Sequence, residues 1–121
     1  MDITRAEESL QAAELCHRAG CYNSSVSRAY YAMYQAAQFA LEAVGLVRTE
    51  WTHGGLQATF ANEILRRRKL YSPFLARDLN IVQDLRHTAD YRESGVSERQ
   101  ATRALGRAQE FVRQIKEHSH G

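Results

Sequence analysis

The sequence predicts an all-α fold, a five-helix antiparallel up-and-down bundle formed by one domain. Apolar residues recur at three- and four-residue spacing along most of the 121-residue chain, and no segment has the two-residue alternation of a strand. The single proline and the scattered glycines are compatible with long helices. Short connections between such helices favour antiparallel neighbours. We therefore expect one domain over residues 1–121, with its core at about residues 4–116.

The first predicted helix covers about residues 4–19, and Gly20 provides a left-handed stop. The second follows a cap at Asn23 or Ser24 and reaches about residue 44, before Gly45. It is the longest predicted helix and is apolar on more than one face, so we expect it at the centre of the bundle. The expected buried stripes are Ile3, Ala6, Leu10, Ala13 and Cys16 in the first helix, and Val26, Tyr30, Met33, Ala37, Leu41 and Val44 in the second, with a flank of Tyr31, Tyr34 and Gln38.

The third helix is predicted over about residues 53–69, after a connector, residues 46–52, that contains Trp51. Ser72 before Pro73 predicts the start of the fourth helix, which continues to about Tyr91. Ser97 and Gln100 form a capping box for the fifth. The expected packing positions are Leu56, Phe60, Ala61, Ile64 and Leu65 in the third helix, Leu75, Leu79, Val82 and Ala89 in the fourth, and Ala101, Ala104, Leu105, Ala108, Phe111, Val112 and Ile115 in the fifth.

Composition limits the class of protein. A content of 44% hydrophobic and 25% charged residues is typical of a globular domain, and no segment approaches the length of a membrane-spanning helix. The amino terminus is acidic and amphipathic and lacks the basic and apolar regions of a secretory signal, so we expect a cytoplasmic protein with no membrane contact. Cys16 and Cys21 lack metal-site spacing and are expected as buried or partly buried free thiols with a structural role.

The net charge of +2 does not by itself predict nucleic-acid binding. Four consecutive cations, residues 66–69, close the third predicted helix, where they favour the negative end of the helix dipole. The simplest interpretation of this cluster is a solvated helix end.

Arg86 is the most informative residue. It falls on the apolar stripe of the fourth helix, between Val82 and Ala89, so its side chain points inward or into a cleft. A guanidinium stays charged at accessible pH, and Asp90, one turn later, is the nearest candidate partner. Two interpretations stay open at this point. Either the ion pair is structural, or Arg86 meets a phosphate.

The structural interpretation joins two helices. Arg28 on the second helix and Arg86 on the fourth would share Asp90, with tyrosine hydroxyls satisfying the remaining donors and acceptors. In this interpretation Tyr30 and Met33 are core residues, and His53 is a packing or helix-start histidine. In the functional one, Arg86, His87, Asp90, Tyr91, Arg28, Tyr31 and His53 bind a ligand.

The string from Ser27 to Tyr34, His53 at the start of the third helix, the segment from Arg86 to Tyr91 and the alanine-rich fifth helix together resemble the HEPN domain family, in particular its small stand-alone prokaryotic members. The resemblance covers about residues 5–116. It implies an all-helical bundle that forms a homodimer, often with a minimal nucleotidyltransferase partner, and in many members a metal-independent ribonuclease.

The family's ribonuclease motif is an arginine, a polar residue and, after four to six intervening residues, a histidine. Arg86 and His87 match the first two positions, but Tyr91 and the two residues after it leave the histidine position unfilled. A phenol with an ordinary pKa near 10 transfers protons poorly at neutral pH, and His87 projects about 100 degrees away from Arg86 around the helix. This favours binding over catalysis.

Two Glu-x-x-His units, Glu14 to His17 and Glu50 to His53, match half of a di-iron motif. The two further inward glutamates that such a site needs are missing, so we expect no metal and no cofactor.

Three hypotheses follow. The first is a HEPN-like dimer that binds a nucleotide, RNA or a nucleotidyltransferase partner, as one half of a toxin–antitoxin type pair. The second is a ribonuclease toxin in which Arg86 stabilises phosphate charge and His87 or Tyr91 transfers protons. The third is a purely structural helical adaptor.

Overall fold

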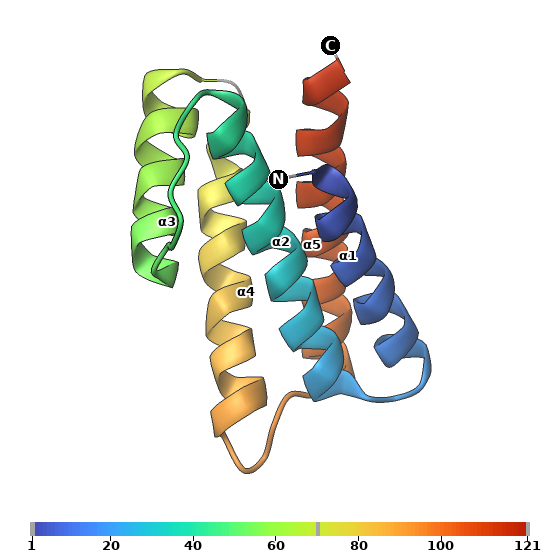
Figure 1. Cartoon of the computed structure of the whole chain (residues 1–121). Helices are drawn as coiled ribbons and strands as arrows, with labels where there is room; N and C mark the ends of the chain where they lie inside the picture. Colours follow the sequence, from blue (N-terminus) through green and yellow to red (C-terminus); the bar gives the residue numbers. More distant parts are fainter. Residues whose placement is uncertain (1, 70, 121) are drawn as a thin grey trace.

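The computed structural model describes residues 2–69 and 71–120, except for the side chains of residues 67, 119 and 120. No strand occurs within these residues. The π-helix η1 continues α3 directly, so the chain forms five helical rods, and the predicted all-α bundle is confirmed (Figure 1). The elements are α1 (Ile3–Arg18), α2 (Tyr22–Ala43), α3 (His53–Thr59), η1 (Phe60–Arg67), α4 (Phe74–Tyr91) and α5 (Glu98–His120).

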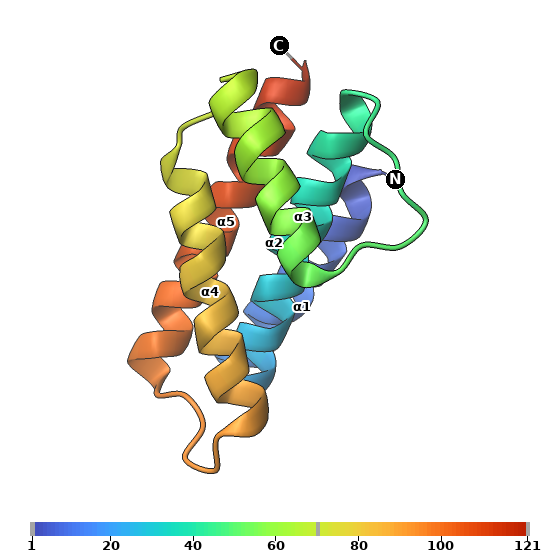
Figure 2. The ribbon, with the colours of Figure 1, turned by 90° about the vertical axis from the view of Figure 1, so that its left-hand side faces the viewer.

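The direction of the rods alternates except between α2 and α3. The connector, residues 44–52, returns along the side of the bundle, so α3 points the same way as α2 (Figure 2). Leu46 and Trp51 in this connector are partly buried against the core, which holds it along the helices. The other connections are short and produce antiparallel neighbours, as predicted.

Helix α2 lies at the centre, as predicted, and packs against every other helical element. Of its predicted stripe, Val44 is only half-buried because it caps the last turn, whereas the other positions are fully or almost fully buried. The neighbouring face of α2 is lined by buried alanines, whose small side chains let the packed helices approach closely. These alanines are Ala29, Ala32, Ala36 and Ala40.

The start of α2 differs from the prediction. The helix begins at Tyr22 with Cys21 as its N-cap and has no side-chain cap. Asn23 instead reaches the loop between α4 and α5, where its Oδ1 accepts a hydrogen bond from the Val96 amide at 2.8 Å. The side chain of Asn23, which its local propensity predicted as a helix cap, therefore makes a tertiary hydrogen bond instead.

The sequence predicted one uniform α-helix for the third rod, but the rod changes to a π-helix at Phe60. The wider π turn places residues four and five positions apart on one face, and Phe60, Ile64 and Leu65 are all buried there. The amide of Arg68 ends η1 with a hydrogen bond to the Glu63 carbonyl at 3.2 Å. In the predicted basic cluster, residues 66, 68 and 69 are exposed, as expected of a solvated helix end, whereas the side chain of residue 67 lies outside the described part.

Helices α4 and α5 begin close to the predicted positions. Helix α4 begins at Phe74, one residue later than predicted, and Ser72 Oγ accepts a hydrogen bond from the Phe74 amide at 3.3 Å. The capping box is confirmed, because Ser97 Oγ accepts from the Gln100 amide at 3.1 Å and Gln100 Oε1 accepts from the Ser97 amide at 2.9 Å. The predicted stripe of α5 is buried, with Leu105 half-buried.

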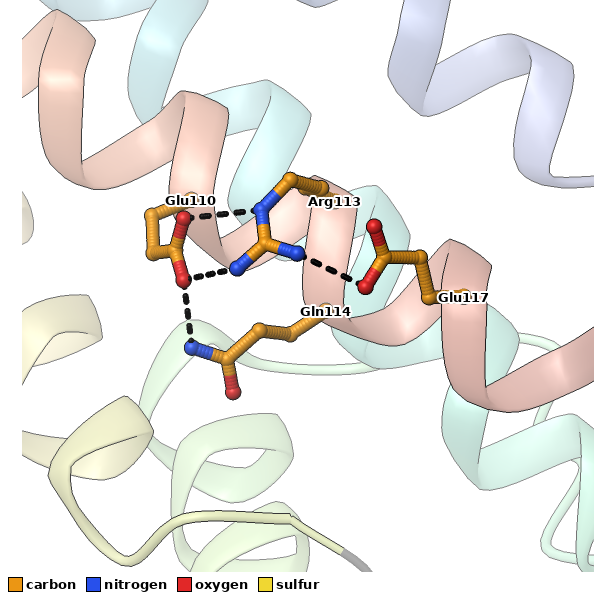
Figure 3. A network of polar contacts seen from close by, with 4 residues as sticks. All are labelled: Glu110, Arg113, Gln114 and Glu117. Carbon is orange, nitrogen blue, oxygen red and sulfur yellow. Dashed lines mark hydrogen bonds and ion pairs between the residues drawn. The ribbon is translucent and has the colours of Figure 1, made fainter. Parts of the chain in front are cut away.

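The outer face of α5 carries a network of charged side chains (Figure 3). Arg113 forms ion pairs with Glu110 one turn before it and with Glu117 one turn after it, and Gln114 donates to Glu110 at 2.9 Å. The hydrogen bonds from Arg113 and Gln114 lower the pKa of Glu110. Such exposed pairs support the helix locally and contribute little to the stability of the fold.

No helix in the described part of the chain is both long and apolar enough to cross a membrane. Both cysteines are free thiols. Cys16 is half-buried, as expected, but Cys21 is exposed, because the N-cap of α2 lies at a surface turn.

Candidate functional site

Three helical elements position the candidate site. Helix α2 contributes Tyr30 and Tyr31 from consecutive positions, α4 contributes Arg86, and α3 contributes its first residue, His53. The Thr52 Oγ1 caps α3 by accepting from the Gly55 amide at 2.9 Å, which fixes the backbone next to His53. The side chains of His53 and Arg86 both lie against the Tyr30 and Tyr31 rings.

Arg86 is held as the sequence predicted. Its side chain is 14% exposed, and its Nε donates to Asp90 Oδ2 at 3.2 Å. The guanidinium carbon lies 5.1 Å from the Tyr30 ring centroid and 5.5 Å from the Tyr31 ring centroid, within the range of cation–π attraction. Burial alone would lower the pKa of Arg86, but its hydrogen bond to Asp90 and the neighbouring Tyr31 outweigh the burial and raise this pKa.

His53 is bound to Tyr30. The His53 Nδ1 and the Tyr30 hydroxyl oxygen are 2.7 Å apart, and the imidazole packs edge-on against Tyr34 with the ring centroids 5.0 Å apart. Burial and the positive charge of Arg86 lower the pKa of His53 below its ordinary value. The imidazole is therefore neutral near pH 7. Burial also raises the pKa of Tyr30, so its hydroxyl keeps its proton.

The predicted sharing of Asp90 by two arginines is wrong. Arg28 is exposed, and among the described residues it forms no ion pair with Asp90. Its guanidinium carbon instead lies 5.1 Å from the Tyr31 ring centroid. Arg28 and Asp90 nevertheless line one open cavity of about 300 Å³ between α2 and α4, whose other lining residues are Cys16, Asn23, Ser24 and Ser27.

His87 and Tyr91 lie apart from this tyrosine pair. Both side chains are exposed, and their rings contact each other at a tilt of 46°, with the centroids 4.8 Å apart. One residue step around the helix separates His87 from Arg86, which is why one side chain is exposed and the other is almost covered.

Two glutamines were not identified from the sequence. Gln57 Nε2 donates to the Tyr30 hydroxyl oxygen at 3.4 Å and also to Gln83 Oε1. The spacing carries a usable signal, because Gln57 is four residues after His53 and Gln83 is three residues before Arg86, so each shares a helix face with a candidate residue. Tyr30, predicted as core, is fully buried, yet its hydroxyl belongs to this network.

The side chains of the first Glu-x-x-His unit, Glu14 and His17, are hydrogen-bonded to α5 and not to a common metal position. His17 Nε2 is 2.8 Å from Thr102 Oγ1, and Glu14 accepts from Gln109 at 3.3 Å. Over residues 2–69 and 71–120, no three histidine, cysteine or acidic side chains converge on a possible metal site.

The comparison with protein families agrees with the all-helical fold. The family model of the HEPN domain matches residues 3–118. No curated protein matches the chain significantly.

Proposed function

Because the chain belongs to the HEPN domain family, we propose that it is a binding module whose ligand is the phosphate group of a nucleotide or an RNA. One observation carries the proposal. Two guanidinium groups from different helices, Arg28 and Arg86, lie 5.1 and 5.5 Å from the centroid of the same tyrosine ring, Tyr31.

The charge balance favours an anion at this position. Asp90 is hydrogen-bonded to Arg86, so one carboxylate stands against two guanidinium groups. A phosphate can accept hydrogen bonds from both arginines, whose planar groups are suited to phosphate oxygens. The adjoining cavity, lined by Ser24 and Ser27 hydroxyls, offers polar contacts to the rest of such a ligand.

The test is a binding titration. A short fluorescein-labelled single-stranded RNA is titrated with the protein and followed by anisotropy, and AMP is titrated separately by calorimetry, so the two sources of phosphate are distinguished. We expect Arg28→Ala and Arg86→Lys each to weaken binding, with a salt dependence reduced by about one phosphate contact for Arg28→Ala.

The matched control is Arg113→Ala, which removes the same charge from the exposed face of α5 (Figure 3). Equal losses in the control and the site variants would indicate non-specific electrostatic attraction. If the wild-type protein binds neither ligand, the proposal is wrong and the adaptor hypothesis gains support.

We also propose that the module is a homodimer and that its partner is a minimal nucleotidyltransferase, as one half of a toxin–antitoxin type pair. The support is the family membership. The broad apolar surface of α2, which the sequence offered as a second argument, is buried against the other helices of the same chain. Sedimentation at micromolar concentration tests the dimer, and co-purification with a nucleotidyltransferase encoded beside it tests the pair. A monomer that captures no such protein would contradict this part.

A ribonuclease is the second candidate, favoured by the position of His53. A neutral imidazole on α3 and the guanidinium of Arg86 lie against the same two tyrosine rings, although the motif histidine is absent from α4. The binding proposal predicts that the purified protein cleaves RNA slowly or not at all. Rapid cleavage that Arg86→Ala abolishes would establish the enzyme instead.

A further inference from the structure

We infer that His53 is a third ligand of the phosphate, donating through Nε2–H as an uncharged imidazole, and that Tyr30 is the positioning residue that fixes this tautomer. The inference rests on the proposed function, because it concerns the same anion site. It assigns a role to a histidine outside the arginine motif, on a different helix.

The hydroxyl proton of Tyr30 determines the tautomer. Tyr30 is fully buried, and its hydroxyl has two hydrogen-bond neighbours, the Gln57 amide nitrogen at 3.4 Å and the His53 Nδ1 at 2.7 Å. An amide NH₂ group can only donate, so this contact uses a lone pair of the Tyr30 oxygen. The buried hydroxyl proton then has Nδ1 as its acceptor.

A neutral imidazole that accepts at Nδ1 carries its own proton on Nε2. The same amide nitrogen also donates to Gln83 Oε1, which agrees with this orientation of Gln57. A chain of four side chains from α4, α3 and α2 therefore ends in one defined donor. The chain runs from Gln83 through Gln57 and Tyr30 to His53.

The His53 ring lies against the same two tyrosines as Arg86. The imidazole centroid is 5.4 Å from the Tyr30 ring centroid and 6.2 Å from that of Tyr31, the two rings on which the Arg86 guanidinium also lies. His53 is half-buried, and its Nε2 has no hydrogen-bond partner among the described residues. An anion that binds Arg86 on this side can accept from Nε2–H.

The surroundings of His53 oppose its protonation. The groups around it are Tyr30, Tyr31 and Tyr34 from α2, Gln57 from its own helix, and Arg86 from α4, whose charge is countered by Asp90. A proton on Nδ1 would face the Tyr30 hydroxyl proton and leave a buried donor without an acceptor. The site thus gains a donor without another positive charge, so we expect affinity for a phosphodiester to vary little between about pH 7 and 8.

The test combines spectroscopy with binding. In the ¹⁵N-labelled protein, the imidazole nitrogen shifts of His53 should show a neutral ring with the proton on Nε2. Tyr30→Phe should abolish this preference and give mixed tautomers. A His53 ring that carries its proton on Nδ1, or that is charged at pH 7.5, would overturn the inference.

The binding arm uses the labelled RNA without a terminal phosphate. We expect His53→Ala to weaken binding by about tenfold, the effect of losing one hydrogen bond to a charged group. His53→Gln, whose amide restores a donor, should recover part of the affinity. His17→Gln is the matched control, because this histidine is bonded to Thr102 on α5.

The outcomes separate the two claims. Wild-type binding that His53→Ala leaves unchanged overturns the role of His53 alone, whereas no binding by the wild-type protein overturns both this inference and the proposed function. Because Tyr30→Phe alters the core, its folding is checked by urea denaturation, and His53→Gln supplies a second variant that leaves Tyr30 in place.

Discussion

Neighbouring side chains replace part of the water around the guanidinium of Arg86. One carboxylate and two aromatic faces surround it, from its own helix and from α2. The same cluster holds a neutral histidine at hydrogen-bond distance from a buried tyrosine. Each of these residues is costly to bury alone, and the contacts between them make the burial possible.

Arg86→Ala should lower the free energy of unfolding by about 1–2 kcal/mol, because it removes a partly buried ion pair and the contacts with two rings. Urea denaturation followed by circular dichroism measures the change. Arg28→Ala is the matched control, since Arg28 is exposed and forms no ion pair among the described residues, where its guanidinium lies on the Tyr31 ring. This substitution should cost less than about 0.5 kcal/mol. Equal effects of the two substitutions would mean that Arg86 contributes no more than a surface arginine.

His53 should make stability depend on pH. Its pKa is lowered in the folded protein, so below its ordinary value near 6.5 the unfolded chain binds more protons at this site than the folded one. The stability that this histidine contributes is therefore complete above about pH 6.5 and is lost as the pH falls towards its folded pKa. Melting temperatures at pH 5–8 should decline less steeply on acidification for His53→Gln than for the wild type. Parallel curves would refute the assignment.

Among the elements, the loop between α4 and α5 is fixed by one side chain of α2. Asn23 accepts from Val96, and the neighbouring Gly95 has a φ of 65°, which favours glycine. A Cβ at Gly95 would lie 2.6 Å from Asn23 Oδ1, the atom that makes this hydrogen bond. A side chain larger than that of glycine at position 95 would therefore disturb the hydrogen bond that connects α2 to the loop between α4 and α5.

Gly95→Ala should destabilise the protein by about 1 kcal/mol more than Gly20→Ala does, because both substitutions strain a left-handed residue but only the first also displaces Asn23 from Val96. Thermal melts of the two variants provide the comparison. Gly20 is suitable as the control because a Cβ there meets nothing within 4 Å. An equal loss in both variants would show that Asn23 moves at no cost.

In the whole molecule, stability is unevenly distributed. Helix α2 contacts all the other elements, whereas the rod formed by α3 and η1 packs on α2 and α4 from one side (Figure 2). In this rod two glycines follow the first residue, His53, and the helix continues as a π-helix, and both features make the rod locally less stable than a regular α-helix. The rod also carries His53, so its opening would expose the candidate site.

Hydrogen exchange should reflect this difference. Amides of α3 and η1 should exchange faster than those in the middle of α2, because the outer rod can open without disrupting the central packing. Mass spectrometry of exchanged fragments gives the comparison, and AMP should slow exchange in the rod if His53 contacts its phosphate. Equal protection of the rod and α2 would show that the bundle opens as one unit.

The five rods, their order and most of their buried positions could be predicted from the sequence, because the three- and four-residue periodicity and the capping residues act locally. The sequence also determined that Arg86 is withdrawn beside Asp90, since both lie one turn apart on one stripe. The tertiary structure alone decided that Asn23 anchors a loop, that the third rod widens into a π-helix, and that Arg28 lies on Tyr31 instead of pairing with Asp90. It also brought His53, Gln57 and Gln83 to Tyr30 from different helices. Such contacts depend on how the rods are rotated and placed against one another, and no local pattern records that.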